Sequence, residues 1–174
     1  MCEGFSLTDN IVLVGMPGAG KSTVGVLLAR ALGMAFVDTD LELQKARGKL
    51  LQEIIDNDGI EGFLKAEEET VLSINCSHAV VATGGSVVYS SRAMMHLKKN
   101  GLVVYLKADL EAIRNRINNM ATRGIAMAGD RTLADIYYER IPLYEKYADI
   151  IIDCSGKDPE GVVGNIIECL RQNR

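Results

Sequence analysis

Residues 15–22 read Gly15-Met16-Pro17-Gly18-Ala19-Gly20-Lys21-Ser22, which satisfies every position of the pattern G-x-x-x-x-G-K-[ST]. The four residues Ile11 to Val14 before it are apolar and mostly β-branched, as is typical of a strand buried on both faces. After it, Thr23 to Leu32 carry apolar side chains at helical spacing. Strand, glycine loop and helix follow in the order that a phosphate-binding loop requires, so the chain is predicted to hold a nucleoside triphosphate.

The chemistry of this loop assigns a role to its polar residues. Glycines let successive backbone N–H groups point at phosphate oxygens, and the start of the helix adds partial positive charge. Lys21 is expected to reach the terminal phosphates, and the Ser22 hydroxyl is expected to ligate Mg²⁺. A chance glycine turn before a helix is the alternative, and the flanking strand and helix disfavour it.

Composition indicates an ordinary globular chain. With 174 residues and no Pro/Gly/Ser-rich linker, residues 1–174 are expected to form one domain. The net charge of -4 and the lack of a Lys/Arg block argue against a nucleic-acid partner. The four cysteines have no C-x-x-C spacing and there are two histidines, which disfavours a zinc site. No secretory leader or membrane-spanning run is recognised, so a cytoplasmic location is expected.

Short apolar runs alternate with longer amphipathic segments, the pattern of a parallel sheet with crossover helices. The fold class is therefore predicted to be α/β, with a five-stranded, doubly wound parallel sheet whose ligands lie beyond the carboxyl ends of the strands. The expected strands are 11–14, 35–38, 79–82, 102–106 and 150–152. The expected helices are 23–32, 40–47, 51–58, 61–74, 91–99, 109–118, 132–147 and 159–171.

Residues 118–130 differ from the rest of the chain. They have weak periodicity, two glycines and a lone arginine between two stronger helices. Phosphoryl transfer needs water to be excluded while the acceptor is in place, which favours a flexible lid here. An ordinary surface loop has the same composition, so both interpretations stay open.

Two carboxylates end the second expected strand, in Phe36-Val37-Asp38-Thr39-Asp40. On extended backbone, residues two apart point to the same side. Asp38 is then expected near the Mg²⁺ shell, and Asp40 is expected to accept a hydrogen bond from the acceptor hydroxyl as its general base. The alternative is that Asp40 only caps the following helix.

Other polar signals are weaker. The third expected strand ends in Thr83-Gly84-Gly85, where bare backbone N–H groups could approach a ligand. An arginine can stabilise the transferred phosphoryl group or clamp a carboxylate. Spacing alone does not distinguish Arg116, Arg123 and Arg140 from ordinary surface arginines.

Together these motifs resemble the shikimate kinases, small P-loop kinases of the nucleoside-monophosphate-kinase-like group, over essentially the whole chain. The resemblance implies ATP- and Mg²⁺-dependent phosphorylation of shikimate to shikimate 3-phosphate, a step of aromatic amino acid biosynthesis, in a monomeric kinase with a lid. It is carried by residues 15–25, 36–40, 83–85, 139–144 and 147–149.

The resemblance also implies roles for individual residues. The catalytic residues would be Lys21, Asp40 and Arg123, with Ser22 and Asp38 at the metal. The acceptor would contact Asp40, Gly84, Gly85 and Arg140, the last through its carboxylate. The nucleotide would contact Gly18, Ala19, Gly20, Lys21, Ser22, Thr23, Arg116 and Lys157.

The main departure from the family pattern lies after the second strand. The family's Phe-Arg-x-x-Glu, whose arginine is half of the carboxylate clamp, reads Phe63-Leu64-Lys65-Ala66-Glu67 here. Leu64 cannot donate a hydrogen bond, and Lys65 lies about 100° further round a helix. Glu67 is kept but loses its arginine partner.

Two further departures lie on the acceptor or lid side. The third glycine of the family's triplet is Ser86, and the lid motif Arg-Pro-Leu-Leu reads Arg123-Gly124-Ile125-Ala126. A lost bidentate arginine costs about tenfold or more in acceptor affinity. The departures therefore leave room for a kinase of a different small hydroxylated acceptor.

Two other functions are weighed beside these. A non-catalytic nucleotide-binding regulatory module would have little need for Asp38, Asp40, Arg123 and Arg140 together. A nucleoside-monophosphate kinase would need more arginines for its phosphate-bearing acceptor than Arg47, which stands alone between residues 41 and 72. A kinase of a small alcohol is favoured, and the sequence leaves its acceptor and oligomeric state open.

Overall fold

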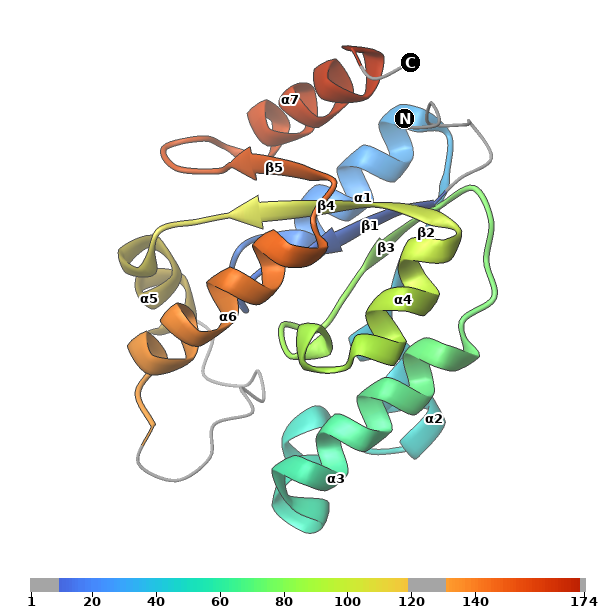
Figure 1. The fold of residues 1–174 in the computed structure, drawn as a ribbon, viewed down its shortest axis with the longest axis vertical. Helices are drawn as coiled ribbons and strands as arrows, with labels where there is room; N and C mark the ends of the chain where they lie inside the picture. The colour runs from blue at the N-terminus through green and yellow to red at the C-terminus, as the bar shows by residue number, and fades with distance from the viewer. Residues whose placement is uncertain (1–9, 119–130, 173–174) are drawn as a thin grey trace.

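A computed structural model describes residues 10–118 and 131–172 of the chain, and its centre is a sheet of five parallel strands in the order β2-β3-β1-β4-β5 (Figure 1). The β1 and β3 residues are all buried, as their apolar runs predicted. All five expected strands are confirmed to within one residue at each end. They are β1 (Asn10–Val14), β2 (Ala35–Asp38), β3 (Ala79–Ala82), β4 (Gly101–Lys107) and β5 (Ile150–Asp153).

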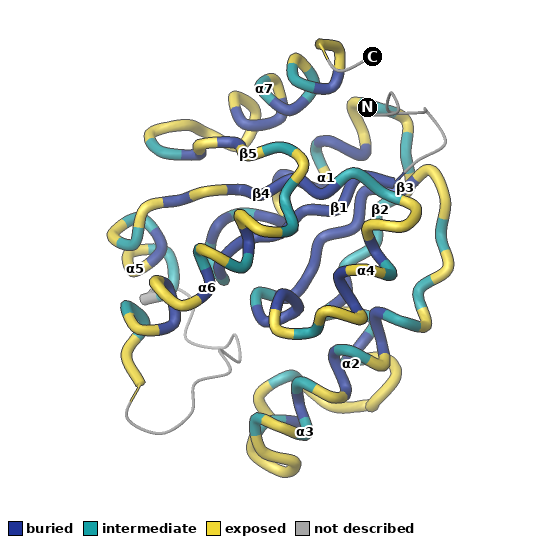
Figure 2. Tube along the Cα trace, in the orientation of Figure 1, coloured by how far each residue is buried: buried dark blue, intermediate teal, exposed yellow. Residues whose placement is uncertain are grey.

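Helices cover both faces of this sheet. Figure 1 shows α1 and α7 side by side on one face and α4 and α6 on the other, and Figure 2 shows the central strands buried between them. The helices are α1 (Lys21–Leu32), α2 (Thr39–Arg47), α3 (Leu51–Ser73), α4 (Ser91–Lys99), α5 (Leu110–Asn118), α6 (Leu133–Tyr147) and α7 (Pro159–Gln172), with a 3₁₀ turn η1 (Val87–Tyr89). No helix of the described residues is long and apolar enough to cross a membrane.

Two details of the helices differ from expectation. The helices expected at 51–58 and 61–74 are one element, α3, with a kink at Gly59, whose φ of 69° and ψ of 179° are not helical. The break between the two expected helices was therefore correctly located at residues 59–60, but it is a kink within one helix and not a loop between two. The turn η1 was not expected. The predicted lid, with Arg123, lies outside the described residues apart from Asn118, which ends α5.

The phosphate loop follows β1 and ends at Gly20, the N-cap of α1. Gly20 has φ 97° and ψ 12°, a left-handed conformation that side chains disfavour. No side chain caps the helix at this point. The first N–H groups of α1 are thus left to face a ligand, as an anion-binding helix start requires.

The carboxylates after β2 are arranged differently from the prediction. The helix α2 begins at Thr39, so Asp40 lies on a helix and not on extended backbone beside Asp38. Asp38 itself is the N-cap, since its Oδ1 accepts hydrogen bonds from the backbone N–H groups of Asp40 (3.0 Å) and Leu41 (3.4 Å). The expectation of two carboxylates on one side of a strand was wrong, and so was the alternative that Asp40 is the cap.

Candidate active site

Two hollows meet at the phosphate loop, and Gly18, Gly20 and Ser22 line both of them. We name them the α7 hollow and the α3 hollow after the helices that close them. The α7 hollow is lined by Gly18, Ala19, Gly20, Ser22, Thr23, Val24, Arg116, Cys154, Lys157, Pro159 and Val162. The α3 hollow is lined by Pro17, Gly18, Gly20, Lys21, Ser22, Asp40, Leu51, Phe63, Glu67, Thr83, Gly84, Gly85, Ser86 and Arg140.

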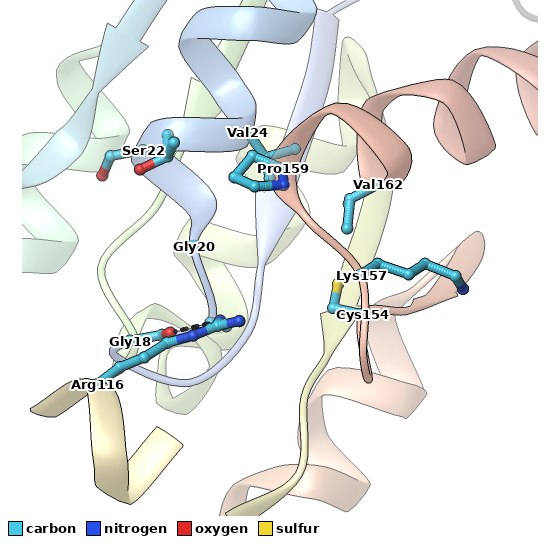
Figure 3. Close-up of a pocket in the computed structure, with 11 residues that line it drawn as sticks. Gly18, Gly20, Ser22, Val24, Arg116, Cys154, Lys157, Pro159 and Val162 are labelled. Atoms are coloured by element: carbon cyan, nitrogen blue, oxygen red, sulfur yellow. Dashed lines mark hydrogen bonds between the residues drawn. The ribbon is translucent and has the colours of Figure 1, made fainter. Parts of the chain in front are cut away.

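The α7 hollow combines the loop with a partly apolar wall (Figure 3). Arg116 reaches from α5 and donates a 3.1 Å hydrogen bond to the Gly18 carbonyl. Lys157 lines the hollow, but its ammonium points away from the loop and donates to the Asp153 carbonyl at 2.7 Å. Loop N–H groups beside apolar side chains suit the phosphates and base of a nucleotide.

Val24 of α1 was not expected at this hollow from the sequence, and neither were three side chains of the opposite wall: Cys154, Pro159 and Val162. These three lie more than 130 residues after the loop, and no local pattern marks them. Cys154 is buried, and burial raises the pKa of its thiol to about 11. It is therefore a neutral, apolar contact at physiological pH.

Lys21 folds back onto the phosphate loop that precedes it. Its Nζ donates to the carbonyl oxygens of Gly15 (2.7 Å) and Met16 (2.9 Å), and the residue is 8% exposed. Lys21 and Arg140 are the two buried cations of the described part of the chain, and both line the α3 hollow. Positive charge is thus concentrated where transferred phosphate and an anionic acceptor would meet.

Ser22 and Asp38 are brought together at the mouth of the loop. The Ser22 hydroxyl donates to Asp38 Oδ2 at 2.8 Å. A hydroxyl and a carboxylate are hard oxygen donors, which fit Mg²⁺, an ion that keeps several waters and takes further oxygens from phosphates. The described residues contain no cluster of three or more His, Cys, Asp or Glu side chains that could hold a metal ion.

Asp40 and Glu67 lie next to each other over Gly84. A Cβ atom placed on Gly84 would be 2.8 Å from Asp40 Oδ1 and 2.1 Å from Glu67 Oε1. The glycine is therefore needed for the two carboxyl groups to approach the loop. The sequence suggested that the Gly84 N–H is bare. In the structure it donates a hydrogen bond to the Thr39 hydroxyl at 3.0 Å.

Glu67 is a site residue that the sequence analysis did not assign. It is 3% exposed, and its Oε2 accepts a 2.8 Å hydrogen bond from Ser86. Burial raises the pKa of Glu67 from 4.5 to about 7; the Ser86 hydrogen bond lowers it, Asp40 raises it, and Arg140 and Lys21 lower it. The sequence held one signal for this role of Glu67, namely the two departures from the family pattern at Leu64 and Ser86. Together they replace the arginine partner of Glu67 by a serine partner.

Arg140 is the largest fully buried side chain in the part of the chain that the structure describes. It comes from α6, its Nε donates to the Tyr89 hydroxyl at 3.1 Å, and its guanidinium lies over the Tyr89 ring at 5.0 Å. The Tyr144 hydroxyl donates to the Gly85 carbonyl at 2.6 Å, which ties α6 to the glycine turn. Arg140 is thus held rigidly, as a residue that binds an anion requires.

Leu64 does not line the α3 hollow. It lines a neighbouring hollow with Lys65, Glu68, Tyr89 and Ser90, and Glu67 and Ser86 border both spaces. Lys65 also lies outside the α3 hollow, so it does not replace the missing arginine there. Its position on the helix had predicted this. Arg140 is the one arginine among the described residues that line the α3 hollow.

Comparison with known proteins gives one consistent result. The family model "Shikimate kinase" matches residues 17–171. The shikimate kinase of Thiobacillus denitrificans is 36% identical over 161 residues, which cover 91% of this chain and 88% of the relative. That of Thermodesulfovibrio yellowstonii is 38% identical over 162 residues, which cover 91% and 93%. The structure of the Acinetobacter baumannii shikimate kinase in complex with shikimate matches with a TM-score of 0.87 at 30% identity, covering 96% of this chain and 95% of that one.

Proposed function

The chain belongs to the shikimate kinase family, and we propose that it transfers the γ-phosphoryl group of ATP to a hydroxyl group of shikimate, giving shikimate 3-phosphate. The observation that carries the proposal is the meeting of two hollows at one phosphate loop, with Asp40 and Arg140 lining the second hollow. A nucleotide in the α7 hollow would place its terminal phosphate at the entrance of the α3 hollow. A metabolite kinase needs this arrangement, and a nucleotide switch does not.

On the donor side, the loop N–H groups and Lys21 would hold the phosphates. Magnesium, held through Ser22 and Asp38, would supply neutralisation of phosphate charge when bound. Arg116 and Lys157 would bind on the adenine side, together with the apolar wall of the α7 hollow. Arg123 is proposed to stabilise the transferred group from the lid.

On the acceptor side, Asp40 would accept the proton of the reacting hydroxyl. The hydroxyl oxygen forms a bond to the γ-phosphorus while the bond to the β–γ bridging oxygen breaks, and ADP leaves with that electron pair. Arg140 would bind the carboxylate of shikimate. Gly84 and Gly85 are proposed to contact the acceptor through their backbone.

A small hydroxylated acceptor other than shikimate is the second candidate. Leu64 lies outside the α3 hollow, so a carboxylate there meets Arg140 without a second described arginine beside it. We further propose that the chain acts as a monomer in the cytoplasm, without a nucleic-acid or membrane partner.

The experiment is a comparison of ADP release with shikimate, quinate, gluconate and glycerate as acceptors, with the product identified by phosphorus NMR. We expect shikimate to be turned over most efficiently. Efficient turnover of another acceptor without turnover of shikimate would establish the second candidate. ADP release that no acceptor accelerates would instead support a nucleotide switch.

A further inference from the structure

Arg140 carries a permanent charge into the interior of the fold. The residue is 1% exposed, and a guanidinium does not lose its proton in a protein. A buried charge is stable only where neighbouring groups compensate for the lost contact with water. The groups that contact Arg140 therefore decide whether its side chain already has one orientation when the acceptor arrives.

Tyr89 contacts the Arg140 guanidinium in two ways at once. Its hydroxyl accepts a 3.1 Å hydrogen bond from Nε, and the centroid of its ring lies 5.0 Å from Cζ. The hydrogen bond fixes the rotation of the guanidinium within its plane, and the ring contact restricts the direction in which that plane faces. Because Nε is used by Tyr89, an anion in the α3 hollow is expected to meet the terminal Nη groups of Arg140.

The contact with Tyr89 joins Arg140 to a different element of the fold. Tyr144 also forms a side-chain hydrogen bond with Arg140, but it lies four residues further along α6, so that bond is made within one helix. Tyr89 belongs to η1, which follows the glycine turn after β3. It therefore fixes the guanidinium relative to a part of the chain that does not move with α6.

The turn that carries Tyr89 is anchored on both sides by other residues. Val87 and Val88 before it are buried in the core. After it, the Ser90 hydroxyl donates to Glu68 at 2.5 Å and caps the start of α4. The Tyr89 side chain itself is 37% exposed, so the core does not depend on it. A substitution of this side chain is therefore expected to leave the fold intact.

We propose that Tyr89 is a positioning residue of the kinase: its ring and hydroxyl hold the Arg140 guanidinium, before the acceptor arrives, in the orientation that binds the acceptor carboxylate. The inference rests on the proposed function. Tyr89 lines the neighbouring hollow and not the α3 hollow, so it acts through Arg140 and not on the acceptor itself. A side chain that is already ordered loses no rotamer freedom on binding, which contributes about three- to tenfold in affinity.

The first test compares Tyr89→Leu and Tyr89→Phe with the matched controls Tyr138→Leu and Tyr138→Phe, which change an exposed tyrosine of α6. Tyr89→Leu removes both contacts and should raise the KM for shikimate about tenfold. Tyr89→Phe keeps the ring contact and should raise it about threefold. The KM for ATP and kcat should stay unchanged, because only acceptor binding is weakened. An unchanged shikimate KM in Tyr89→Leu overturns the proposal.

The second test determines whether Tyr89 acts through Arg140. In an Arg140→Lys background, adding Tyr89→Leu should raise the shikimate KM no further, because lysine has neither the Nε group nor the planar guanidinium that Tyr89 contacts. Additive losses of affinity in this cycle overturn the proposal.

A shikimate analogue with a hydroxymethyl group in place of the carboxylate gives an independent measurement. Its KM should be the same in Tyr89→Leu as in the wild type, since it has no anionic group for Arg140. The analogue is also the control for folding, because a damaged fold would impair both acceptors alike. A loss with the analogue equal to the loss with shikimate overturns the proposal.

Failure of the proposed function is recognised separately, as an absence of shikimate turnover by the wild-type chain. The role of Tyr89 is then decided by thermal shift with ADP and Mg²⁺, using quinate, gluconate and glycerate. Stabilisation by one of these acids that is equal in the wild type and Tyr138→Leu but smaller in Tyr89→Leu supports the role. Equal shifts in all three chains, including no shift in any, refute it.

Discussion

The Ser22 hydroxyl donates a 2.8 Å hydrogen bond to Asp38 Oδ2, which joins the phosphate loop to the end of β2. The other oxygen of Asp38 caps α2, the helix that carries Asp40. One carboxylate thus fixes the proposed metal-binding hydroxyl and the start of the helix that presents the proposed base. Asp38 therefore has a structural role beside its proposed role at the metal.

Asp38→Asn separates these two functions. Asparagine caps helices about as well as aspartate, so the melting temperature should change little. The lost charge should raise the Mg²⁺ concentration needed for half-maximal activity about tenfold, as measured by Mg²⁺ titration of ADP release. Asp38→Ala removes the cap as well and should cost a further ~1 kcal/mol of stability. An unchanged Mg²⁺ requirement in Asp38→Asn would contradict the metal role.

Asp40→Asn should abolish phosphorylation of the acceptor while nucleotide binding survives. General-base catalysis contributes about 10²- to 10⁴-fold, so a loss in this range is expected in acceptor turnover. Lys21→Ala should damage nucleotide binding and turnover together, because Lys21 lies in the loop. The control is the exposed Asp56→Asn on α3. Normal turnover by Asp40→Asn would show that another group is the base.

The pKa of Glu67 makes stability depend on pH. The folded-state pKa is raised from 4.5 to about 7, because burial disfavours the carboxylate. Stability from this group is complete below pH 4.5 and is lost as the pH rises towards 7. Glutamine does not titrate, so the melting temperature of Glu67→Gln minus that of the wild type should increase from pH 5 to pH 8. A difference in melting temperature that stays constant over this range would mean that ionisation of Glu67 does not destabilise the folded protein.

Leu64→Arg tests the departure from the family pattern. The arginine would enter the neighbouring space that Glu67 and Ser86 also border. We expect the KM for shikimate to fall about tenfold, since a charge-assisted hydrogen bond contributes ~1.5 to 3 kcal/mol. The added cation should also lower the pKa of Glu67. Lys65→Arg, one position along the helix, is the matched control and should change neither quantity.

Gly84→Ala tests the close approach of the two carboxyl groups. The added methyl would meet Glu67 Oε1 at 2.1 Å and Asp40 Oδ1 at 2.8 Å, so it should destabilise the fold by ~1 to 3 kcal/mol and raise the acceptor KM. Gly164→Ala on α7 meets nothing within 4 Å and should stabilise by ~0.5 to 1 kcal/mol. Chemical denaturation of both variants measures the contrast. Similar stabilities would show that the glycine turn can shift at little cost.

Local sequence determined much of this protein. The β1 run Ile11–Val14 predicts a buried strand because both of its faces are apolar, and the glycines of residues 15–22 predict the phosphate loop because only such backbone can curl around an anion. The same reasoning located all five strands and the break at Gly59. The loop motif pointed to Lys21 and Ser22, and the end of the second strand pointed to Asp38 and Asp40. The structure brings these four residues together.

Tertiary structure decided the rest. Pro159 and Val162 reach the loop because α7 packs against α1, and Cys154 reaches it because it directly follows β5, which pairs with β4. The Ser86–Glu67 hydrogen bond joins the turn after β3 to the middle of α3, and the unpaired oxygen of Glu67 exists only because Gly84 lets that carboxyl group approach. Local sequence specifies backbone conformation and which face is apolar. Long-range packing decides which distant side chains meet.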